Sequence, residues 1–121
     1  MKQRKRIEFL GVRVDVWLYS DDEPVEGHRE GVFGWCDYDI ENQEFAIGFR
    51  GLICEAAIVH ECFHLYFAIL SLMDAKEHTM GDLIDEIYAY SFQDLYSKVL
   101  ETVTGMKLYK RIWNERKDDQ Q

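Results

Sequence analysis

Residues 52–73 form an almost entirely apolar run of 22 residues, the longest in the chain. A run of this length fits either a membrane-spanning helix or a helix in the core of a small protein. Three ionisable groups interrupt its centre, at His60, Glu61 and His64. Membrane proteins that hold such groups surround them with further apolar spans, and this sequence has none. The run therefore predicts a helix through the centre of a soluble core, with no membrane partner.

The composition is that of one globular domain. The chain has 121 residues, 47% of them hydrophobic, which is enough for a single core. Its three cysteines are an odd number without a CxxC pair, and each lies in apolar sequence, as buried thiols in a reducing compartment do. The basic first residues lead into broken alternation rather than an apolar signal segment. We therefore expect one cytoplasmic domain over residues 1–121.

The first half of the chain alternates between apolar and polar residues, which is the pattern of β-strands. The alternation is clearest at 12–19, and a shorter strand is predicted at 6–10. Residues 20–30 are rich in turn-forming residues and are expected to form a loop. Two further strands are predicted at 31–38 and 44–50. The polar turn between these two indicates that they pair as a hairpin.

The second half has the residue spacing of α-helices. After the apolar run, Thr79 with Asp82 three residues later resembles a capping box, which starts a second helix. This helix is expected over 82–104, and Gly105 is a natural stop.

The remaining residues complete the predicted fold. Residues 106–113 predict a short extra strand or helix, and the polar residues after Trp113 predict a frayed end. Together the elements predict an α+β fold. Its N-terminal sheet is antiparallel or mixed, has about four strands and packs on two long helices.

The ionisable groups of the apolar helix have a metal-binding spacing. Residues 60–64 read HECFH, an HExxH motif. Because residues four apart lie on one helix face, the imidazoles of His60 and His64 can reach the same zinc ion. Glu61 lies about 100° further round the helix, where it can act as a general base toward a water on that metal. Burial of three such groups without a metal would be costly, which favours zinc over hydrogen-bonded core histidines.

A catalytic zinc needs a third protein ligand and one open position. Glu86 on the second helix is the preferred candidate, because a helix folded back on the first would bring it to the metal. Ala89 follows three residues later and is small enough to let the two helices approach closely. Asp82, Asp85 and His78 are the alternatives.

The combination of HECFH at 60–64 and EIYA at 86–89 resembles the gluzincin pattern, HExxH with a downstream ExxA or ExxD. The short chain and its element order are similar to the minimal gluzincin-like metallopeptidases, which include small proteins often encoded by phages and prophages. The resemblance covers about residues 31–104. It implies a zincin-like fold, one zinc ion, and hydrolysis of peptide bonds by a zinc-bound water that Glu61 activates. It also implies that the strand at 44–50 runs along the cleft and pairs with an extended peptide.

Such an enzyme would also use groups around the metal. Donors to a tetrahedral oxyanion would complete the site, and Tyr88, Tyr90 and His78 are the candidates. A ligating histidine usually has a hydrogen-bonding partner behind it, for which Asp85 is a candidate together with Asp82.

The charge of the chain bears on its partners. The net charge is -9, and residues 7–106 contain 20 acidic residues against 5 Lys and Arg. This balance favours a basic peptide or protein substrate and disfavours nucleic acid. Two non-enzymatic hypotheses remain beside the peptidase. One is a metal-stabilised binding or regulatory protein without turnover, such as a phage-type effector or inhibitor. The other is an acidic decoy that competes with nucleic acid for a basic protein.

Overall fold

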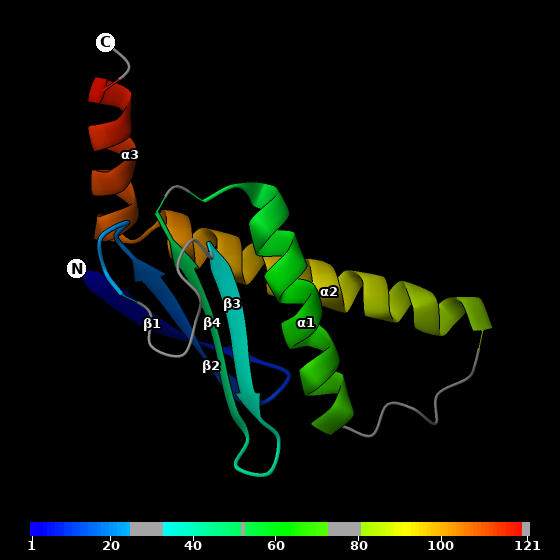
Figure 1. The fold of residues 1–121 in the computed structure, drawn as a ribbon. Helices are drawn as coiled ribbons and strands as arrows, with labels where there is room; N and C mark the ends of the chain where they lie inside the picture. Colours follow the sequence, from blue (N-terminus) through cyan, green and yellow to red (C-terminus); the bar gives the residue numbers. More distant parts are fainter. Residues whose placement is uncertain (25–32, 52, 73–80, 120–121) are drawn as a thin grey trace.

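The computed structural model describes residues 1–24, 33–51, 53–72 and 81–119, the last with side chains over 87–115. Within these residues the chain forms a four-stranded sheet followed by three helices (Figure 1). The predicted α+β class and the N-terminal position of the sheet are confirmed.

The first two strands form a tight antiparallel hairpin. β1 (Lys2–Phe9) pairs along its whole length with β2 (Val12–Tyr19), so β1 begins four residues before the predicted start. Leu10 and Gly11 connect the strands with φ angles of 49° and 79°. Two consecutive positive φ angles are what a type I′ turn requires, and glycine at the second position adopts this conformation without strain.

β3 (Gly34–Asp39) and β4 (Glu44–Arg50) pair as the predicted hairpin. β4 also lies parallel to β2, so the sheet is mixed, with the strand order β1-β2-β4-β3. This order corrects one expectation. β4 is paired on both sides and cannot be the strand that offers an edge to a peptide. The edge strand at this side of the sheet is β3, and it lies beside the first helix (Figure 1).

The helices are α1 (Glu55–Leu72), α2 (Gly81–Thr104) and α3 (Lys107–Asp119). α2 ends where it was predicted to end, and the amide of Gly105 donates to the carbonyl of Glu101 at 3.0 Å. α3 replaces the short segment and frayed end that the sequence predicted, because Leu108 and Ile112, one turn apart, are both buried against the domain.

All three helices pack on one face of the sheet and close a single core over it. Alternate residues of β2 and β4 point to this face, as their period-two pattern predicted. The largest of the fully buried side chains are Val14, Val16, Leu18, Ile47, Phe49, Ile58, Leu65, Ile69, Leu95, Val99, Val103 and Met106.

The apolar sequence of α1 predicted a helix through the centre of the core, and this prediction was wrong. One side, with Ile58, Leu65 and Ile69, is buried, while Phe63 and Phe67 on the other side are about half exposed. By length and composition α1 could also cross a membrane. A single such helix is weak evidence, because helices from the cores of soluble proteins meet the same criterion.

Candidate metal centre

The two histidines of the HExxH motif lie on the solvent-facing side of α1. The side chain of His60 is 68% exposed, and His64 is exposed as well. Glu61 is only 12% exposed, because it turns toward the sheet. The expectation that all three groups are buried was therefore wrong for both histidines. Because the histidines are exposed, the cost of burying them gives no support to a metal here. Support for a metal comes from the geometry of the side chains alone.

The two imidazoles are in contact through their Nε2 atoms. Their Nε2 atoms are 3.3 Å apart, with the ring planes at 79°. Two nitrogens bound to one tetrahedral zinc at 2.0–2.1 Å stand about 3.3–3.4 Å apart, so the spacing fits a shared ion. A hydrogen bond from a ring N–H is usually shorter, at about 2.7–3.2 Å. The separation thus matches that of two nitrogens on one zinc, and it also lies within hydrogen-bonding distance of a ring N–H and a ring nitrogen.

Glu61 is held beside this pair by β3. One carboxylate oxygen lies 3.9 Å from Nε2 of His60. The carbon chain of Glu61 passes over Gly34, where an added Cβ would stand 3.0 Å from its Cγ. Glycine at this position leaves the space that the carboxylate occupies. The first residue of β3 thereby helps to place the candidate general base.

Two thiols lie near Glu61, Cys36 on β3 and Cys62 on α1. Burial raises the pKa of each thiol to about 12, and the negative charge of Glu61 adds to the effect. Both are neutral thiols at physiological pH and poor metal ligands in that form. Cys62 is buried as predicted, Cys36 is partly covered, and Cys54 is exposed, contrary to the prediction.

The third ligand lies outside the part of the structure that describes side chains. Glu86, Asp82 and Asp85 belong to the first turns of α2, for which only the backbone is described, and His78 lies outside the described residues. Among the described side chains, no group of three His, Cys, Asp or Glu could hold a metal. The choice of Glu86 over its competitors stays a prediction.

The described contacts between α1 and α2 involve Tyr66 and Phe63 of α1. The hydroxyl of Tyr66 donates to the carbonyl of Tyr88 at 3.2 Å. Tyr66 points about 160° away from His64 around the helix axis, so the imidazoles face away from this contact. Phe63 lies between the two directions and contacts Phe92, with ring centroids 6.1 Å apart. The described contacts between the two helices therefore lie on the side of α1 away from the histidines.

The candidate oxyanion donors Tyr88 and Tyr90 have no described contact with the two histidines. Tyr90 is 68% exposed, and Tyr88 contributes its backbone carbonyl to the helix contact. Their role as donors stays a prediction.

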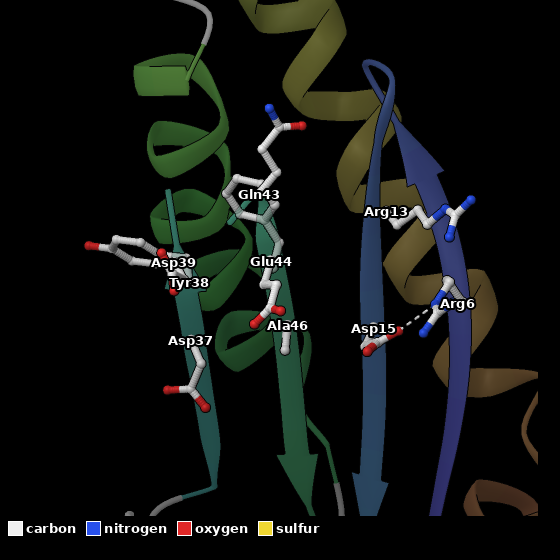
Figure 2. Close-up of a pocket in the computed structure, with 10 residues that line it drawn as sticks. Arg6, Arg13, Asp15, Asp37, Tyr38, Asp39, Gln43, Glu44 and Ala46 are labelled. Carbon is white, nitrogen blue, oxygen red and sulfur yellow. Dashed lines mark hydrogen bonds and ion pairs between the residues drawn. The ribbon is translucent and has the colours of Figure 1, made fainter. Parts of the chain in front are cut away.

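The sequence did not indicate a hollow with a volume of about 580 Å³ that the structure describes (Figure 2). It lies on the opposite face of the sheet, which no described helix covers, and its lining is strongly charged. The only signal in the sequence is the polar half of the strand alternation, and that half is usual for a solvated sheet face. The lining residues are Arg6, Arg13, Asp15, Asp37, Tyr38, Asp39, Gln43, Glu44, Phe45 and Ala46.

Comparisons with known proteins leave this site without a precedent. No protein-family model matches the chain, and searches of curated proteins and of solved structures gave no match. The gluzincin-like assignment therefore stays a prediction from residues 60–64 and 86–89. The observations behind the candidate site are local: two imidazoles in contact and one carboxylate beside them.

Proposed function

We propose that this chain is a zinc-dependent, metallopeptidase-like protein in which His60 and His64 hold the ion. The observation that carries the proposal is the 3.3 Å separation of their Nε2 atoms. Glu86 is the proposed third protein ligand. When bound, zinc would polarise the carbonyl of a peptide bond and lower the pKa of a water molecule toward ~7.

Glu61 is the proposed general base. Its carboxylate lies beside His60 and is largely shielded from solvent by β3. From this position it accepts a proton from the attacking water and then delivers that proton to the leaving amine. A carboxylate that is fixed before the substrate arrives needs little reorganisation during the reaction.

β3 is the proposed platform for the substrate, in place of β4. Among the described residues, β3 has a strand partner on one side only. An extended peptide can add to such an edge through backbone hydrogen bonds. Since Gly34 at the start of β3 touches Glu61, a peptide on this edge passes close to the carboxylate. The acidic body of the chain suits a peptide with basic residues.

The test compares two glutamates of α1. Zinc content is measured by elemental mass spectrometry in wild type, Glu61→Gln and Glu55→Gln. Glu55 is an exposed residue in the first turn of the helix and serves as the control. Hydrolysis is measured by mass spectrometry on a mixture of peptides from a digested proteome. Glu61→Gln should keep its zinc and lose at least about a hundredfold in rate, as the loss of a general base implies. Glu55→Gln should match wild type in both measurements.

The other outcomes are equally informative. Equal turnover by Glu61→Gln and wild type would contradict the proposed role of Glu61. A wild-type chain that binds zinc and cleaves no peptide would favour the metal-stabilised binding protein. A chain that takes up no zinc would remove the basis of both.

A further inference from the structure

A row of exposed apolar side chains runs along α1 directly beside the two histidines. Val59, Phe63 and Phe67 are spaced four residues apart and are 41%, 52% and 53% exposed. We infer that this row is a specificity subsite, which receives a large apolar side chain of the peptide held at His60 and His64. The inference rests on the proposed peptidase function and names the class of side chain that the site selects.

The positions on the helix place the row and the histidines next to each other. At about 100° per residue, Phe63 lies about 60° from His60, and Phe67 lies about the same angle from His64. β3 and Glu61 are on the other side of the histidines. A peptide that extends along β3 with one carbonyl at the histidines would therefore have the rings of Phe63 and Phe67 on the far side of the histidines, where one of its side chains can reach them.

The rings already form one surface. The Phe63 and Phe67 centroids are 4.8 Å apart at an interplanar angle of 64°, and Phe63 also contacts Phe92. Because Phe63 is braced on both sides, an incoming side chain meets an apolar wall that needs little ordering. Pre-formed apolar surface of this kind binds an apolar group at a low conformational cost.

A peptide side chain fits this surface better than a broad partner does. A second copy of the chain or a membrane that covered the row would also cover the adjacent imidazoles and Glu61. A single side chain leaves them accessible. An acidic side chain is disfavoured here, since Glu61 is nearby and the chain as a whole is acidic.

Two small zinc-binding probes separate the subsite from the metal. Phenylalanine hydroxamate and glycine hydroxamate share the group that binds zinc and differ by a benzyl side chain. Their affinities for the zinc-loaded chain are measured by titration calorimetry. We expect phenylalanine hydroxamate to bind at least about tenfold more tightly, since burying a phenyl group contributes at least about 1.4 kcal/mol, one factor of ten.

Substitutions then locate the preference. Phe67→Ser and Phe63→Ser should each reduce the tenfold difference and leave the affinity for glycine hydroxamate unchanged. Phe67→Ser is the cleaner variant, because Phe63 also packs on Phe92. Trp113→Ser is the matched control, an aromatic residue on α3 with similar exposure, and should leave the difference intact.

The results distinguish failure of the subsite from failure of the metal site. Equal binding of the two probes by wild type would overturn the subsite and leave the zinc proposal standing. Binding of neither probe would overturn both. A preference that survives both phenylalanine substitutions would overturn the subsite, and a simultaneous change from dimer to monomer in sedimentation would assign the row to contact between copies.

Discussion

The exposed side of α1 and the helix-free face of the sheet are both open to solvent, but their polar groups are arranged differently. On the sheet face, Arg6 Nε donates to Asp15 at 2.8 Å, and the side-chain amide of Asn42 donates to Asp39 at 2.7 Å. The hydrogen bonds from Asn42 lower the pKa of Asp39. On α1, the two imidazole nitrogens point at one another instead.

This difference separates a surface with paired charges from the proposed metal site. Several charges that line the hollow on the sheet face already have partners, since Arg6 pairs with Asp15 and Asp39 accepts from Asn42. The His60 and His64 pair instead places two ring nitrogens at the spacing that one cation requires. We therefore give the convergence of donors more weight than the volume of the hollow.

The largest expected effect is on zinc affinity. Loss of a residue that is hydrogen-bonded to a metal ligand typically weakens metal binding about 10–100-fold. Loss of the ligand itself should weaken binding more. His64→Ala should therefore weaken zinc binding by more than about a hundredfold in a competition assay with a fluorescent chelator. Asp39→Asn, on the sheet face, should bind zinc as wild type does. Equal weakening in both variants would mean that zinc binds by overall acidity, and the distinction between the two faces would fail.

The sequence predicted local elements better than their arrangement. The alternation at 12–19 predicted strand β2 and the side chains of it that face the core. The predicted bounds of β4 also match the structure. The parallel pairing of β2 with β4 depends on contacts between segments far apart in the chain, which local patterns do not record. For that reason the expected cleft strand was β4, whereas the edge belongs to β3.

The exposure of the motif was mispredicted for a related reason. Val59, Phe63 and Phe67 add large apolar residues to the exposed side of α1, so the sequence alone indicated a helix buried all round. The spacing of His60 and His64 follows from helix geometry and was predictable. Their third partner depends on how α2 crosses α1, which the motif does not specify.

The next effect is on stability and should come from the sheet face. A Cβ added at Gly48 would stand 2.2 Å from the ring of Trp35, which also contacts Tyr19 at a centroid distance of 5.1 Å. Gly48→Ala should therefore lower the free energy of unfolding in urea by about 1–3 kcal/mol, the usual cost of overpacking. Zinc affinity should stay at the wild-type value, because the histidines lie on α1 and not on this face. Reduced zinc binding in a folded Gly48→Ala chain would show that the two faces are coupled.

The smallest effect should come from the ion pair beside the hollow. The hydrogen bond to Asp15 is the main cause of the raised pKa of Arg6, yet the two side chains are 49% and 26% exposed. Water and salt screen such a pair, and ordering two side chains offsets much of its attraction. Arg6→Gln should therefore leave the melting temperature unchanged within error at physiological salt, and zinc affinity should not move. A clear, salt-dependent loss of stability would show that the sheet face relies on its charge pairs. The hollow would then become a competing candidate site, in which a charged ligand could replace one member of an ion pair.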